Sequence, residues 1–225
     1  MNISDIKHLI SEKTATFLAR GTHPLLIDGQ WVQAESGQTI DVINPANEEV
    51  IAKVASAGKA EVDKAVAAAR RAFDQGPWGK MRGAERERLL MKLADLLEAN
   101  AQSFAEVESL DNGKSAAMAQ AVDVAVAVDT IRYMAGWASK IEGATTDISV
   151  PFAPQAEFVT FTRREAVGVV AAVVPWNFPL LLAVWKLAPA LATGCTVVLK
   201  PAEQTPLTAI MLGELIIEAD RKSVV

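Results

Sequence analysis

Short apolar runs separated by turn residues make up the first patterned part of the chain. Residues 25–27 and 31–32 are apolar and flank Asp28-Gly29, a pair typical of two-residue hairpin turns. A further run over 39–43 ends at Asn44-Pro45, where proline disfavours continuation. The pattern therefore predicts a hairpin followed by another strand.

Apolar residues then recur at helical spacing in four segments, which predicts helices over 61–73, 84–99, 101–110 and 115–141. Gly113 follows the third segment and suits a left-handed residue after a helix. The fourth segment is rich in alanine and has a shallow apolar stripe. It is interpreted as a core helix, with a partner-binding helix as the alternative.

The pattern changes between 145 and 164. Residues 148–152 and 158–161 are rich in β-branched and aromatic side chains, and 153–156 contain a proline between them. This pattern predicts two β segments that form a hairpin projecting from the domain.

Residues 167–219 predict a strand, a helix, a second strand and a second helix. The run 167–174 is apolar throughout, as expected for a parallel strand covered on both faces. A helix follows to Thr193, Gly194 ends it, and 196–199 form a second short apolar run. Thr205-Pro206 predicts the start of the last helix, with Thr at the N-cap and Pro at the first position.

This order is a βαβ unit with a right-handed parallel crossover. Ligands of such sheets bind just beyond the carboxyl ends of the strands. The loops there are residues 175–179 and 200–206. The sequence therefore predicts one ligand site built from these two loops.

Composition excludes several classes of function. The net charge of −5 and the absence of basic runs give no reason to expect nucleic-acid binding. The longest strongly apolar stretch, 166–176, is too short to span a bilayer, and the first 21 residues lack the pattern of a secretory signal. One cysteine permits no internal disulfide, so a cytoplasmic protein is expected. His8 and His23 are isolated, and no metal site is predicted.

Asn177 lies on the first loop between two prolines. An amide held on a rigid loop at a strand end can donate to a developing oxyanion, which is typically worth about 3 to 4 kcal/mol in the transition state. The alternative is an asparagine that caps the following helix. The residue type alone leaves both interpretations open.

The second loop carries Lys200 and Glu203. A lysine and a carboxylate at a strand end can bind vicinal ribose hydroxyls, and a carboxylate there would repel a 2′-phosphate, which favours NAD over NADP. A surface ion pair of little consequence is the alternative. The chain has no G-x-G-x-x-G or P-loop pattern, so the standard dinucleotide fingerprint is absent.

Taken together, two long motifs resemble the aldehyde dehydrogenase superfamily: Pro-Trp-Asn-Phe-Pro at 175–179 and Gly-Cys-Thr-Val-Val-Leu-Lys-Pro-Ala-Glu-Gln-Thr-Pro at 194–206. The resemblance covers roughly residues 24–219 and includes Asn44-Pro45, 110–114 and 133–138. A narrower resemblance, at 149–151 and 162–165, is to phenylacetaldehyde dehydrogenases.

The resemblance implies a Rossmann-like α/β fold and NAD-dependent oxidation of a small-molecule aldehyde. In the family a cysteine attacks the aldehyde, hydride passes to nicotinamide, and a glutamate-activated water hydrolyses the thioester. Asn177 would help to form the oxyanion hole, and Phe178 and Trp185 would border the aldehyde tunnel. Residues implied to bind the cofactor are Val173, Val174, Pro175, Trp176, Lys200, Pro201, Ala202 and Glu203.

The resemblance also implies a domain organisation. Residues 24–144 and 166–219 would form an incomplete NAD-binding domain, after an N-terminal extension over 1–23. Residues 145–165 would form a β segment for oligomerisation, which implies a homo-oligomer. The tail over 220–225 departs from the family pattern and resembles a terminal strand of phenylacetaldehyde dehydrogenase-like chains.

The family's Gly-x-Thr-x-x-Gly turn, base glutamate and nucleophilic cysteine do not occur in this sequence. Cys195 lies at the start of a predicted buried strand, where a cysteine behaves as an inert small hydrophobe. The chain is therefore expected to lack the catalytic domain and to be inactive alone. The alternative function is a non-catalytic NAD-binding or assembly module.

Overall fold

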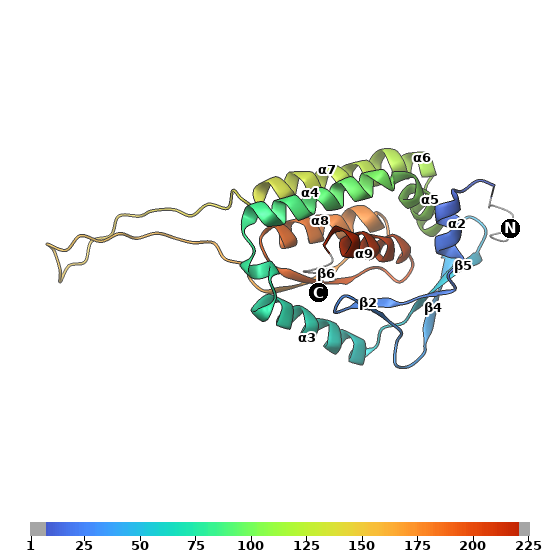
Figure 1. The fold of residues 1–225 in the computed structure, drawn as a ribbon, viewed down its shortest axis with the longest axis horizontal. Coiled ribbons are helices and arrows are strands. Elements are labelled where there is room, and N and C mark those ends of the chain that lie inside the picture. Colours follow the sequence, from blue (N-terminus) through green and yellow to red (C-terminus); the bar gives the residue numbers. More distant parts are fainter. Residues whose placement is uncertain (1–7, 221–225) are drawn as a thin grey trace.

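A computed structural model describes residues 8–220 (Figure 1). Its first elements are helix α2 (Glu12–Leu18) and a mixed sheet in the order β1 (Thr22–His23), β5 (Glu49–Ala55) and β4 (Thr39–Asn44). β1 is parallel to β5, whereas β4 is antiparallel to it. The predicted strand over 39–43 is confirmed, whereas α2, β1 and β5 were not predicted. The tail residues 221–225 lie outside the described part of the chain.

The predicted hairpin is confirmed as β2 (Leu25–Ile27) and β3 (Gln30–Val32), which pair in antiparallel register. Both turn residues are left-handed, with φ of 56° at Asp28 and 69° at Gly29. These are the signs of φ that a two-residue type I′ turn requires, and Asp-Gly is a favoured pair for it.

The predicted helices are present with shifted ends, as α3 (Lys59–Gln75), α4 (Gly83–Ala99) and α5 (Ala101–Asn112), and a short 3₁₀ turn η1 (Trp78–Lys80) joins the first two. Gly113 follows α5 in the left-handed region, with φ 87°. The predicted long helix ends earlier than expected and has three parts: α6 (Ala116–Met118), a π-helical segment η2 (Ala119–Val124) and α7 (Ala125–Trp137).

The predicted βαβ order is confirmed. β6 (Val169–Val173) and β7 (Thr196–Lys200) are parallel and joined by α8 (Pro179–Ala192), and α9 (Leu207–Ala219) follows. α8 packs against this sheet on one side and α3 on the other (Figure 1). Gly194 ends the connection with φ 92°.

The prediction for the start of α9 was wrong. Pro206, not Thr205, occupies the N-cap position, and no side chain of that residue caps the helix. The cap comes from another element, because the main-chain N–H of Leu207 donates to Asp111 Oδ2 at 3.0 Å. A partner 96 residues away in sequence could not be read from local spacing.

The main core lies among α4, α5, α7, α8 and α9. α4 and α7 run side by side and cover α8, as Figure 1 shows. Phe104, Leu97 and Ile131 are among the fully buried side chains there. The helix over 125–137 thus contributes to the core, with Ile131 and Ala135 buried. No helix among residues 8–220 combines the length and the apolar character needed to cross a membrane.

The segment 144–162, called the arm here, projects far from the rest of the molecule (Figure 1). Its projection is as predicted, but the two predicted strands do not form. A single antiparallel bridge joins Thr145 to Phe161, and the main-chain N–H of Thr162 donates to Ala144 O at 2.8 Å. The side chains of Phe152, Val159 and Phe161 are 92%, 90% and 69% exposed, so no apolar face of the arm is covered by the chain itself.

Candidate functional site

The two predicted loops meet at one edge of the β6–β7 sheet. Val173 at the end of β6 is in register with Lys200 at the end of β7. One residue further on, the main-chain N–H of Val174 donates to Lys200 O at 3.2 Å. The carboxyl ends of the strands are therefore level, and the loops that follow start side by side. This is the edge at which parallel α/β sheets bind ligands.

On the second loop, Lys200 Nζ donates to Glu203 Oε1 at 2.5 Å. Both side chains are about half exposed, at 52% and 54%. The hydrogen bond from Lys200 lowers the pKa of the Glu203 carboxyl. Ala202 between them in sequence is buried, and Pro201 is half-buried. The loop thus offers one cation and one carboxylate, both accessible and both anchored to the strand end.

The first loop exposes a mixed surface. Val173 and Trp176 are 67% and 58% exposed, whereas Val174 between them is buried. Pro175 and Asn177 are also exposed. α8 has Phe178 at its N-cap position, with no side-chain cap, so Asn177 is not the capping residue that the alternative interpretation required.

Among the described residues, the Asn177 side-chain amide makes no hydrogen bond, and it remains available for one. Phe178 and Trp185, the residues predicted to border the substrate, are 37% and 51% exposed. Phe178 is the N-cap residue of α8, and Trp185 lies in the middle of that helix.

The turn over residues 112–114, which was not predicted to belong to the site, contacts the main chain of the first loop. Asn112 Nδ2 donates to Trp176 O at 2.7 Å. Lys114 Nζ donates to Asn177 O at 3.1 Å and lies 4.1 Å from the centroid of the Phe178 ring. The sequence signal was the segment 110–114, which was interpreted only as a helix end and as part of the resemblance.

Several buried carboxyls lie beneath this turn. Asp123 is fully buried and its Oδ1 is 2.5 Å from Lys114 Nζ, whose side chain is 16% exposed. Burial, and then the neighbouring Asp123 carboxyl, raise the pKa of Glu108 to about 8. Burial likewise raises the pKa of Asp111 to about 8. Both carboxyls are therefore largely protonated at neutral pH, which avoids burying two further charges.

Cys195 is buried, at 3% exposure, as predicted. Its main-chain N–H donates to Ala190 O at 2.9 Å at the end of α8, away from the carboxyl ends of the strands. His23 is also buried and packs against Phe17, and burial, with Arg20 nearby, lowers its pKa to about 4. Within residues 8–220 no group of three His, Cys, Asp or Glu side chains could hold a metal ion.

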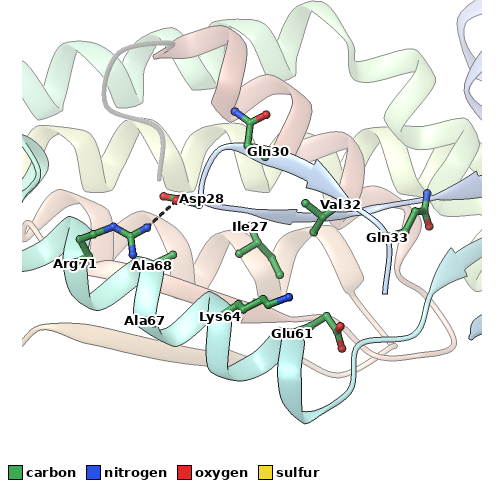
Figure 2. Close-up of a pocket in the computed structure, with 10 residues that line it drawn as sticks. All are labelled: Ile27, Asp28, Gln30, Val32, Gln33, Glu61, Lys64, Ala67, Ala68 and Arg71. Atoms are coloured by element: carbon green, nitrogen blue, oxygen red, sulfur yellow. Dashed lines mark hydrogen bonds and ion pairs between the residues drawn. The ribbon is translucent and has the colours of Figure 1, made fainter. Parts of the chain in front are cut away.

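Figure 2 shows a surface pocket of about 420 Å³ between the β2–β3 hairpin and α3. It shares no residue with the two strand-end loops. Its charged side chains already have partners: Arg71 Nη2 lies 2.7 Å from Asp28 Oδ2, and Glu61 accepts from the main-chain N–H of Gly58 at 2.7 Å. The pocket therefore does not extend the candidate site.

The parallel β6–β7 pair, its connecting helix and the level strand-end loops define an α/β protein with a βαβ unit. Comparison with known proteins is more specific, because residues 31–223 match the model of the aldehyde dehydrogenase family. The chain is 49% identical to phenylacetaldehyde dehydrogenase of Pseudomonas fluorescens over 197 residues, which are 88% of this chain and 39% of that protein. It is 50% identical to aldehyde dehydrogenase 1A1 of Gallus gallus over 196 residues, which are 87% of this chain and 37% of that protein.

A solved structure agrees with these relatives. The NAD⁺ complex of aldehyde dehydrogenase from Bacillus cereus superposes with a TM-score of 0.88 at 45% identity, over 93% of this chain and 41% of that one. The chain belongs to the aldehyde dehydrogenase family, and the predicted family and Rossmann-like fold class are confirmed. It spans about two fifths of the length of the curated relatives that it matches.

Proposed function

We propose that this chain forms the cofactor-binding part of an enzyme that oxidises an aldehyde to a carboxylic acid with NAD. The observation that carries the proposal is the level register of Val173 with Lys200, which brings the Asn177 loop and the Lys200–Glu203 loop to one sheet edge. Membership of the aldehyde dehydrogenase family supports aldehydes as the substrate class. A related structure at 45% identity holds NAD⁺.

The residues present fit the adenosine half of NAD. Lys200 and Glu203 are accessible hydrogen-bonding groups for the ribose hydroxyls, and Pro201 and Ala202 offer main-chain contacts beside them. Val173 and Trp176 provide exposed apolar surface along the same edge, and Val174 and Pro175 shape the backbone between them. NAD, when bound, supplies the hydride acceptor. The Glu203 carboxylate would disfavour the extra phosphate of NADP by repulsion.

Asn177 has the chemistry of an oxyanion-hole donor. Its amide can donate to the aldehyde oxygen as negative charge develops there, and the proline on each side limits the loop's alternatives. Phe178, before α8, and Trp185, on that helix, would line the path of the aldehyde. We further propose that the nucleophile and the general base are not supplied by this chain, because Cys195 is buried away from the loops.

Replacing Glu203 with glutamine should weaken NAD binding about tenfold, because a charge-assisted hydrogen bond to ribose is worth about 1.5 kcal/mol or more. The same change should narrow the preference for NAD over NADP, since the repelling charge is gone. Isothermal titration of the chain with each dinucleotide measures both effects.

Asp41→Asn is the matched control. Asp41 is paired with Lys53 at 3.0 Å, and their side chains are 48% and 52% exposed, much like the Lys200–Glu203 pair. This pair lies on β4 and β5, away from the β6–β7 edge. Equal loss of NAD affinity in both variants would argue against a specific ribose site at Glu203.

Aldehyde-dependent NADH formation tests the proposal that this chain does not supply the nucleophile and the general base. We expect this chain alone to form no NADH. The absorbance at 340 nm is followed with about ten times more protein than an assay of a complete enzyme needs. Turnover that survives Cys195→Ala would show that another group of the chain acts as nucleophile. Turnover abolished by that change would contradict the inert role assigned to Cys195.

The arm supports assembly with another copy, and we propose a homo-oligomer. An apolar segment as exposed as Phe152, Val159 and Phe161 is typical of surfaces that pack against a partner. The double variant Val159→Asp, Phe161→Asp should shift the chain toward the 24.0 kDa monomer in sedimentation velocity. Val167→Asp, at an 87% exposed position outside the arm, is the control and should leave the distribution unchanged.

A further inference from the structure

The turn Asn112-Gly113-Lys114 contacts the main chain on both sides of Asn177. Asn112 Nδ2 donates to Trp176 O, and Lys114 Nζ donates to Asn177 O, at 2.7 and 3.1 Å. We propose that this turn is a positioning clamp, anchored by the buried carboxylate of Asp123, that sets the backbone of Asn177 and the direction of its Cα–Cβ bond. The effect of the clamp on catalysis rests on the proposed function of Asn177. The existence of the clamp does not depend on that function.

The peptide plane explains why two carbonyl contacts suffice. Trp176 O belongs to the peptide unit before the Asn177 Cα, and Asn177 O belongs to the unit after it. Each unit is planar, so fixing both carbonyls fixes φ and ψ of Asn177 and hence the direction of its Cα–Cβ bond. The contacts thus set the point from which the side-chain amide extends, while χ1 and χ2 of Asn177 remain free to adjust to a ligand.

Lys114 is suited to hold its carbonyl because its other contacts limit its movement. Its Nζ pairs with Asp123, which is fully buried in η2, and lies over the Phe178 ring. π-helical segments of this kind occur frequently at functional sites, where they redirect a side chain. Glu108 on α5 lies beside Asp123, and Thr208 on α9 lies beside Glu108, so three elements meet around the anchor.

Gly113 fixes the turn relative to the rest of the domain. Its φ of 87° lies in the left-handed region, and a Cβ there would come within 2.8 Å of Pro45 Cγ. The turn therefore packs closely against the end of β4, and only glycine permits that approach. The clamp is thus tied to the N-terminal sheet as well as to η2.

Triple-resonance NMR of the intact chain, without NAD or aldehyde, tests the clamp directly. Lys114→Met should shift the Asn177 carbonyl carbon and the Phe178 amide upfield and increase the fast backbone mobility of 175–178. Asn112→Ala should do the same at the Trp176 carbonyl. Lys114→Arg keeps a donor and the charge, and should restore much of the parent signal. Lys140→Met, which removes an exposed lysine donating to Gly136 O, is the control and should leave the loop unchanged.

Lys114→Met leaves the Asp123 carboxylate buried without its cation and could unfold the chain. The double variant Lys114→Met, Asp123→Asn removes both charges and provides a folded reference that lacks the Lys114 contact but keeps that of Asn112. Unchanged shifts of the Asn177 carbonyl carbon and the Phe178 amide, with unchanged backbone mobility there, in that folded variant would overturn the proposal. Altered shifts with unchanged NAD affinity would support the clamp even if the ribose site at Glu203 failed its own test.

Discussion

Truncation of Phe104 to alanine should lower the free energy of unfolding by about 3 to 5 kcal/mol, the usual cost of deleting a buried phenylalanine. Phe104 is 1% exposed on α5, in the core shared with α4, α7, α8 and α9. The cost combines lost apolar burial with the cavity that remains, because close-packed helices relax only in part. Urea unfolding followed by circular dichroism measures it.

Tyr133→Ala is the control for this change. Tyr133 is an aromatic side chain on α7 that is 63% exposed, so its loss should alter the free energy of unfolding by only about 0.5 kcal/mol. Similar costs for the two variants would contradict the position of the core described above. Phe104→Leu, which fills most of the volume, should fall between them.

The contribution of Glu108 and Asp111 to stability should decline as pH rises from about 4 to about 8. Burial holds the pKa of Glu108 and of Asp111 near 8, above their ordinary values of 4.5 and 3.8. The folded state therefore binds more protons than the unfolded state in this range, and the free energy of unfolding falls with pH. Their contribution is fully present below about pH 4 and lost above about pH 8. The slope approaches about 1.4 kcal/mol per pH unit for each carboxyl.

Glu108→Gln isolates one of these carboxyls, because glutamine resembles the protonated acid and does not titrate. The difference in unfolding free energy between parent and variant should therefore change between pH 5 and pH 8, measured by urea titration at each of about six pH values. Glu98→Gln, at an exposed residue paired with Arg132, is the comparison. If the free energies of unfolding of parent and Glu108→Gln change with pH in parallel throughout this range, Glu108 is already ionised in the folded chain.

Local patterns predicted the elements whose causes are themselves local. Asp28-Gly29 predicted a type I′ hairpin because both residues tolerate positive φ, and the structure has that turn. The continuous apolar runs before Pro175 and Lys200 predicted two parallel strands, and their ends meet as expected. The prediction that the first strand is covered on both faces was wrong, because only Ala172 of β6 is buried and Val173 is 67% exposed. The positions of Asn177, Lys200 and Glu203 at one sheet edge follow from this topology, whereas their roles remain predictions.

The sequence was less informative wherever a distant partner decides the structure. The arm has strand-like composition, but its two segments make one bridge, because few groups of the chain lie beside them. β5 was not predicted, although its Ile51, Ala52 and Val54 are buried against neighbours. The contacts of Asn112 and Lys114 with the 176–177 carbonyls span more than 60 residues, and no local spacing encodes them.

The hydrogen-bonded base of the arm also determines how freely the length of the arm can change. Ala144 and Thr162 are hydrogen-bonded neighbours, so the chain leaves the body and returns to it at nearly the same point. The path from α7 to β6 is therefore continuous without the residues between them, and the arm is topologically an insertion. Since the entropy of closing a loop grows only with the logarithm of its length, the arm can lengthen or shorten with little effect on the folded body. Its sequence can therefore vary while the strand-end loops remain fixed by the sheet.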